Sequence, residues 1–110
     1  MGKLSNIRRT KMLAQEGRCY YCSLPMWDPK LKVAATELCL APNMPKLLRC
    51  TAEHLHARSE GGADSPSNIV AACWFCNTRR HHRKAPPSPD VYRAYVQKRM
   101  AKGKWLAGYL

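Results

Sequence analysis

Hydrophobic residues recur at helical spacing near the amino end of the chain. Ile7 and Met12 stand among charged and polar residues, and Gly17 follows them. Ser5 is a candidate N-cap for such a helix, and glycine is common just after a helix ends. The pattern therefore predicts an N-terminal helix over residues 5–16.

A second amphipathic helix is predicted near the carboxyl end, over residues 89–102. Ser88 can cap its amino end, and Pro89 suits the first helical position, where no backbone N–H is needed. The apolar positions that follow share one helical face: Val91, Tyr92, Tyr95 and Val96. One helix is thus expected to flank each end of the chain.

The middle of the chain predicts two strands followed by a helix. The strands are residues 48–55 and 69–72, and the Gly-, Ser- and Pro-rich residues 59–66 form a loop between them. A helix over residues 73–84 ends before a Pro-Pro pair that cannot continue it. This order of elements predicts an α+β fold.

A proline-rich connection separates the N-terminal helix from the first strand. Four prolines in residues 24–48 argue against regular structure running through this segment, although a short helix near residues 32–38 is expected. The sequence marks no repeat, low-complexity run or domain boundary. The 110 residues are therefore predicted to form a single domain, residues 1–110, with a core at about residues 19–84.

The chain is strongly basic, which bears on its partners. Lysine and arginine number 19 against 7 aspartates and glutamates, for a formal net charge of +12 at pH 7. A net charge of roughly 2–8 is enough to keep a small domain soluble. We therefore expect a polyanion, nucleic acid, as the partner, bound in a salt-sensitive way. The alternative is that the charge only keeps the protein soluble.

Neither a secretory signal nor a membrane span is expected. The amino end has no apolar run with a small-residue cleavage site, and no segment approaches the ~18 apolar residues of a membrane helix. We therefore expect a soluble, cytoplasmic protein that contacts no membrane. In such a reducing compartment, paired cysteines bind metal more often than they form disulfides.

Four of the six cysteines form two pairs, each with two residues between its members. Such C-x-x-C knuckles present thiolates at one edge of a tetrahedron, and two of them make a closed, structural zinc site with Cys19, Cys22, Cys73 and Cys76 as ligands. An iron-sulfur cluster is the alternative. Cys39 and Cys50 stand alone and are interpreted as small, unpaired thiols.

Between the two knuckles lies a set of residues in a distinctive order. Glu53 and His54 end the first predicted strand, Asn68 follows across a loop containing Gly61-Gly62, and Asn77 directly follows the second knuckle. In this order and spacing the chain resembles the HNH endonucleases, the ββα-metal or His-Me finger nucleases, in the subgroup with two C-x-x-C knuckles. The resemblance covers residues 19–83.

The resemblance implies a ββα-metal core with a structural four-cysteine zinc site, and it assigns roles that the chemistry supports. His54, a neutral imidazole near physiological pH, is the expected general base that activates water. Glu53 is the expected carboxylate ligand of a catalytic divalent cation, and Asn77 a further ligand from the helix. Asn68 is expected to fix the loop that orients His54.

Two features leave the ligand set open. His81 lies four residues after Asn77 on the same helical face, so it could ligate the cation or contact phosphate. His56 and His82 add further imidazoles. One departure from the family is Ala57, where proline is frequent, and it should affect the stiffness of the loop rather than the chemistry.

A basic run follows the second knuckle. On a helix that carries active-site residues, cationic side chains should grip the phosphates flanking the scissile one, although such runs are often only a solvated face. The expected nucleic-acid-binding residues are Arg58, Arg79, Arg80, His82, Arg83 and Lys84. Trp105 and Tyr109 are candidates for base stacking, with packing against the core as the alternative.

Together these features predict an endonuclease that hydrolyses DNA with Mg2+, Mn2+ or a similar divalent cation. The resemblance implies products with a 5′-phosphate and a 3′-hydroxyl. A zinc-stapled nucleic-acid-binding module without catalysis is one alternative, and a ribonuclease with the same site is another. A fold shared with a family fixes neither the substrate nor the activity.

Overall fold

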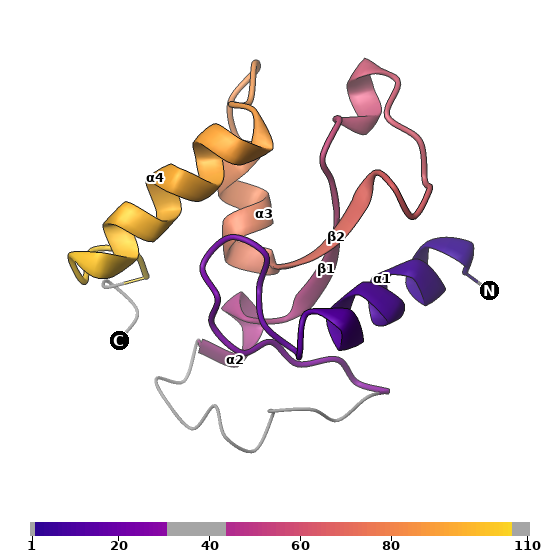
Figure 1. The fold of residues 1–110 in the computed structure, drawn as a ribbon, viewed down its shortest axis with the longest axis horizontal. Helices are drawn as coiled ribbons and strands as arrows, with labels where there is room; N and C mark the ends of the chain where they lie inside the picture. Colours follow the sequence, from indigo (N-terminus) through magenta and orange to yellow (C-terminus); the bar gives the residue numbers. More distant parts are fainter. Residues whose placement is uncertain (1, 31–43, 107–110) are drawn as a thin grey trace.

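The computed structural model describes residues 2–30 and 44–106. The elements in chain order are α1 (Lys3–Ala14), α2 (Met44–Leu47), β1 (Cys50–His54), the 3-10 helix η2 (Arg58–Glu60), β2 (Ile69–Cys73), α3 (Trp74–Arg80) and α4 (Pro89–Ala101) (Figure 1). The predicted α+β fold is confirmed. The helix expected near residues 32–38, together with Cys39 and Tyr109, lies outside the described residues.

The centre of the described fold is an antiparallel hairpin of β1 and β2. Cys50 pairs with Cys73 at one end and His54 with Ile69 at the other. All five residues of β2 are buried, since other elements cover both of its faces. β2 leads directly into α3, where the Sγ atom of Cys73 caps the helix by accepting a hydrogen bond from the Cys76 N–H. Strand, strand and helix thus form a ββα unit.

Helix α1 packs along the hairpin (Figure 1). Met12 is fully buried, and the Gln15 side chain exchanges two hydrogen bonds with the backbone of Ala71 in β2. The helix begins at Lys3, so the expectation that Ser5 caps it is wrong. Gly2 takes the N-cap position with a φ of 105°, a conformation that glycine adopts at little cost, and the helix therefore starts two residues earlier than predicted.

Helix α4 follows the sequence prediction closely. Ser88 caps it by accepting a hydrogen bond from the Val91 N–H, and Pro89 is its first residue. Tyr92 is buried and donates a hydrogen bond of 2.7 Å to the carbonyl oxygen of Cys76, which joins α4 to α3. Val91 and Tyr95, expected on the same face as the buried Tyr92 and Val96, are instead 62% and 45% exposed.

Helix α3 is shorter than the predicted segment 73–84. It ends at Arg80, and His81 is its C-cap. The backbone N–H of His82 bonds to the carbonyl oxygen of Arg79, a tightened turn that closes the helix, and the Arg80 side chain donates to the carbonyl oxygen of Pro87. This bond draws residues 81–87 back across the helix end. None of the described helices has the length and apolar character needed to cross a membrane.

Candidate active site

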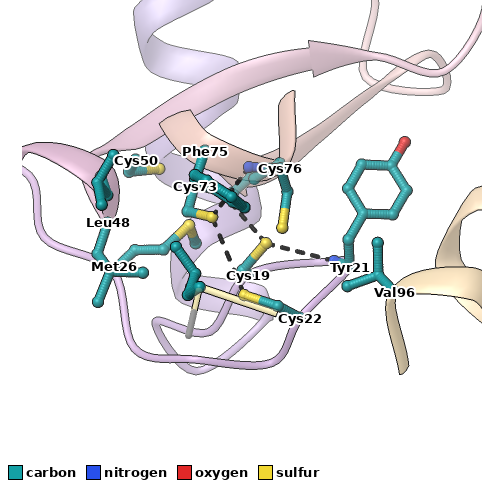
Figure 2. Packing of buried hydrophobic residues seen from close by; sticks show 14 of the residues in the cluster. Cys19, Tyr21, Cys22, Met26, Leu48, Cys50, Cys73, Phe75, Cys76 and Val96 are labelled. Atoms are coloured by element: carbon teal, nitrogen blue, oxygen red, sulfur yellow. Dashed lines mark hydrogen bonds between the residues drawn. The ribbon is translucent and has the colours of Figure 1, made fainter. Parts of the chain in front are cut away.

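The four knuckle cysteines converge in the core between α1, the hairpin and α4. Their sulfur atoms all lie within 4.8 Å of one another, and every one of the four side chains is buried (Figure 2). A tetrahedral site with Zn–S bonds of about 2.3 Å would place its sulfurs roughly 3.8 Å apart, and the Cys22 and Cys73 sulfurs are 3.9 Å apart. The cluster could therefore hold a metal ion such as zinc.

The four buried thiols cannot all ionise together without a cation among them. Burial opposes ionisation of Cys19, but hydrogen bonds from the other three cysteines hold its pKa well below the usual value. Hydrogen bonds with Cys19 and Cys22 raise the pKa of Cys73 and of Cys76 well above that value. One thiolate is thus stabilised at the expense of the others, and four thiolates together require a positive charge at their centre.

Glu53, on β1, is a fully buried carboxylate with three partners. Its Oε2 atom accepts hydrogen bonds from the Tyr21 hydroxyl at 2.8 Å and from the Arg80 guanidinium at 3.0 Å. Its Oε1 atom lies 2.7 Å from Nε2 of His81. Burial, and then the charge of Glu53, raise the pKa of Tyr21, so the hydroxyl remains a donor. Oε1 is therefore the oxygen that can reach a cation beside His81.

His54, the next residue on β1, is held by an acidic partner. Its Nε2 atom lies 2.7 Å from Oδ1 of Asp64, whose Oδ2 accepts a hydrogen bond from Arg58 at 3.0 Å. The contact with His54, and then the charge of Arg58, lower the pKa of Asp64. An ionised carboxylate only accepts hydrogen bonds, so Nε2 of His54 carries the proton and Nδ1 of the neutral ring keeps its lone pair.

Asn77 approaches the same region from α3. Its Nδ2 atom donates to Oγ1 of Thr51 at 3.0 Å and to the carbonyl oxygen of Ala52 at 3.3 Å. The amide nitrogen is thereby committed to β1, and the carbonyl oxygen is the atom that can serve as a ligand. Glu53, His54, Asn77 and His81 line one cavity of about 220 Å³.

Asn68 ties together the two sides of the loop between β1 and β2. Its side chain accepts a hydrogen bond from the His56 N–H and donates to the carbonyl oxygens of His56 and Ala63. Gly62 passes so close to this turn that a Cβ there would lie 1.8 Å from the His56 carbonyl oxygen. The loop that carries Asp64 is therefore fixed at both ends.

The order of these residues along the chain is that of a known family. Residues 37–83 match the family model of the HNH endonucleases. This part of the chain, called the HNH region below, is similar to the HNH endonucleases. This confirms the resemblance inferred from the motif and indicates a nuclease-type function that acts on nucleic acid. The comparisons with curated proteins and with solved structures found no match.

The described residues contain one cluster of thiols and, apart from it, a mixed set of oxygen and nitrogen donors. In the part of the chain that the structure describes, the cysteine cluster is the one group of three or more His, Cys, Asp or Glu side chains suited to a metal ion. A catalytic cation would instead depend on Glu53 and His81 together with the amide oxygen of Asn77. These three donors come from β1 and from α3 and its C-cap.

The structure corrects one predicted nucleic-acid contact. Arg80 is 3% exposed and donates to Glu53 and to the carbonyl oxygens of His54, Leu55 and Pro87, so it is a structural partner of the active site rather than a phosphate clamp. The other five side chains expected at that surface are exposed: Arg58, Arg79, His82, Arg83 and Lys84.

Three contacts of the HNH region were not anticipated from the sequence. Tyr21 lies between the two cysteines of the first knuckle and belongs to no motif of its own. Asp64 looks like an ordinary loop residue. The available signal for Arg80 was indirect: a carboxylate at the end of a buried strand needs a charged or hydrogen-bonding partner. Nothing in the sequence indicates which of the neighbouring arginines supplies it.

Proposed function

We propose that this chain is a metal-dependent HNH endonuclease that hydrolyses phosphodiester bonds of DNA. The observation that carries the proposal is the single cavity lined by Glu53, His54, Asn77 and His81. The imidazole of His54, the proposed base, and the buried carboxylate of Glu53 both line it, and none of the four knuckle cysteines does. A module that only binds nucleic acid has no need for this pairing.

His54 is the general base of the proposed reaction. Its Nδ1 atom takes a proton from water as the water oxygen attacks phosphorus, and the bond from phosphorus to the 3′-oxygen breaks. The leaving oxygen takes a proton from solvent, which gives the 5′-phosphate and 3′-hydroxyl ends that the family resemblance implies. Asp64 keeps the other ring nitrogen protonated and fixes the plane of the ring.

The catalytic cation is proposed to be Mg2+, Mn2+ or a similar ion held by Glu53, Asn77 and His81. A carboxylate, an amide oxygen and an imidazole suit such ions, and the imidazole favours Mn2+ or another transition metal over Mg2+. The ion supplies positive charge that stabilises the transition state and the leaving oxygen. The zinc ion is proposed to be structural, in the closed set of four thiolates.

Exposed cationic side chains around the cavity are proposed to hold the flanking phosphates. Arg58 borders the cavity itself, Arg79 lies on α3, and the other three follow that helix. Such contacts give position along the backbone and little sequence readout. The proposed residues are Arg58, Arg79, His82, Arg83 and Lys84.

The test is cleavage of supercoiled plasmid by zinc-loaded protein with added Mg2+ or Mn2+. The wild type should cut, and His54→Ala should lose roughly 10²- to 10⁴-fold in rate because it lacks the base. His56→Ala is the matched control, since its imidazole is 61% exposed and does not line the cavity. It should cut at the wild-type rate and, like His54→Ala, retain its zinc.

Two results would contradict the proposal. Equal cleavage by the wild type and His54→Ala would remove the mechanism, and binding without cleavage under all conditions would favour the non-catalytic module. Running the same variants on single-stranded and duplex RNA separates the deoxyribonuclease from the ribonuclease. A preference for RNA would overturn DNA as the substrate while leaving the site in place.

A further inference from the structure

A second cavity, larger than the active-site cavity, lies between α3 and α4. It has a volume of about 400 Å³, within the range of roughly 300–1,000 Å³ found for small-molecule sites. Its walls are aromatic and aliphatic, formed by Tyr92, Tyr95, Trp105, Val91 and Pro87. The proposed cleavage reaction uses none of these side chains.

The cavity wall is partly exposed to solvent, and contacts with neighbouring side chains hold it in place. Val91 and Tyr95 are one turn apart on α4 and are 62% and 45% exposed. Tyr95 meets the Trp105 ring edge-to-face at 5.8 Å, and the Trp105 indole N–H donates to the Cys76 sulfur at 3.3 Å. The wall is thus fixed to the thiolate cluster, and a planar ligand could stack on it without much reordering of side chains.

The rim of this cavity is cationic. Arg79, His82 and Arg83 line it and are exposed, and none of the described residues that line it is a carboxylate. An aromatic wall beside a row of cations suits a planar group attached to an anion. A nucleobase with its phosphate meets both conditions, since any base offers a π-face and cations track the backbone.

One side chain that lines the α3–α4 cavity also contacts residues of the active site. Arg80 lines the α3–α4 cavity and also donates to Oε2 of Glu53 and to the carbonyl oxygen of His54. A smaller hollow beside Trp74 and Phe75 shares Arg79 and His82 with the α3–α4 cavity. The basic, aromatic surface therefore continues along α3.

We propose that the α3–α4 cavity binds an unpaired nucleobase of the nucleic acid whose backbone enters the active site. The inference rests on the proposed function for the identity of the polymer. Bases in an intact duplex are stacked within it, so the cavity selects substrates in which a base near the cleavage point is unpaired or extruded. The chain would then prefer single-stranded, mismatched or branched substrates to uniform duplex.

The test compares two fluorescent 12-nucleotide single strands by anisotropy, one of deoxythymidines and one of equal length and charge with abasic sites. Zinc-loaded His54→Ala is used so that the strands are not cut. The strand with bases should bind roughly 5- to 100-fold more tightly, in line with stacking of a base on aromatic side chains. Adding Tyr95→Ala should bring that ratio close to one.

Leu13→Ala is the matched control, because Leu13 is a large hydrophobic residue, 61% exposed, that does not line this cavity. It should keep the preference for bases. Equal binding of the two strands, or a preference that survives Tyr95→Ala, would overturn the inference. The preference and plasmid cleavage are scored separately. Cleavage without the preference removes only the base pocket, and the preference without cleavage removes only the nuclease.

Discussion

At the scale of single residues, the contact between Asp64 and His54 decides which ring nitrogen is free to act. The two side chains are 2.7 Å apart, and Asp64 is held in turn by Arg58. A carboxylate in this place fixes both the tautomer and the orientation of the base. An amide can present its N–H to the ring instead, which would favour the wrong tautomer.

Asp64→Asn is therefore expected to slow cleavage on the order of 10²-fold, as for a misplaced catalytic group. Substrate binding and zinc content should stay unchanged, because Asp64 contacts neither. The measurement is the single-turnover rate with plasmid in excess Mn2+. Glu60→Gln, an exposed acidic residue of the same loop, is the control and should keep the wild-type rate. A wild-type rate for Asp64→Asn would exclude the positioning role.

Cys50 illustrates a thiol that the fold keeps unreactive. It is buried, and burial raises its pKa to about 12 from an ordinary 9.0. The fold's preference for the protonated thiol is thus fully present below pH 9 and is lost as the pH rises towards 12.

Because the thiolate is the nucleophile, iodoacetamide at pH 8 should leave Cys50 of the native protein unmodified. Peptide mapping by mass spectrometry measures this. The same peptide from protein unfolded in guanidinium should be fully alkylated, which serves as the control. Labelling of Cys50 at equal rates in both samples would show that the thiol is neither buried nor suppressed.

At the scale of elements, Arg80 joins α3 to β1 and to the segment that leads into α4. It compensates the charge of Glu53 and satisfies three backbone carbonyls. Removing one partner of a buried ion pair leaves the other charge uncompensated, which typically costs about 3–5 kcal/mol. The guanidinium is therefore a condition for keeping a carboxylate so deep in the fold.

Arg80→Ala is expected to lower the free energy of unfolding by about 3–5 kcal/mol. Urea denaturation of the zinc-loaded protein measures this. Arg79→Ala is the adjacent control: its guanidinium lies 4.8 Å from the centroid of the Phe75 ring and is exposed, so the loss should be about 1 kcal/mol or less. Equal, small losses in both variants would contradict the buried pairing of Arg80 with Glu53.

The loop between β1 and β2 depends on Gly62 for a different reason than on Gly61. Gly61 has a φ of 94° with open space around it, so alanine there meets only the strain of left-handed backbone, about 1–2 kcal/mol. At Gly62 a Cβ would collide with the His56 carbonyl. Gly62→Ala should therefore destabilise the protein more than Gly61→Ala in thermal unfolding and should also reduce cleavage. The reverse order of stabilities would show that the loop is not packed in this way.

Sequence reasoning succeeded for the elements with strong local signals. Ser88 and Pro89 mark the start of α4, and two apolar runs separated by Gly-, Ser- and Pro-rich turn residues mark the hairpin. It failed where distant residues decide the outcome. The end of α3 depends on the bond from Arg80 to Pro87, and Arg80 itself looked like any residue of a basic run. Partners separated by tens of positions leave no periodic trace in one sequence.

At the scale of the whole molecule, we propose that one group of ligands holds the fold and a second group supports the chemistry. The cysteines join the segment after α1 to the start of α3, and they sit in the same core as Met12, Tyr21 and Val96. A small chain gains much of its stability from such a metal site, since binding energy is folding energy when the unfolded chain has no preformed site. The proposed catalytic ions can then exchange without loss of the fold.

The net charge of +12 acts on the same scale. It attracts a polyanion from any direction, while the exposed cations beside the two cavities orient it. Affinity for nucleic acid should therefore fall steeply with salt, whereas the preference for unpaired bases should depend on it far less.

The account depends most on a second, exchangeable cation held by Glu53, Asn77 and His81. Electron paramagnetic resonance during titration of zinc-loaded protein with Mn2+ counts such sites directly. We expect the wild type to bind one Mn2+ ion per chain. The affinity for Mn2+ should fall on the order of tenfold or more in Asn77→Ala and His81→Ala and stay unchanged in His56→Ala. Every variant should retain one zinc ion. Unchanged Mn2+ affinity in both cavity variants, or binding of Mn2+ only as zinc is lost, would contradict it.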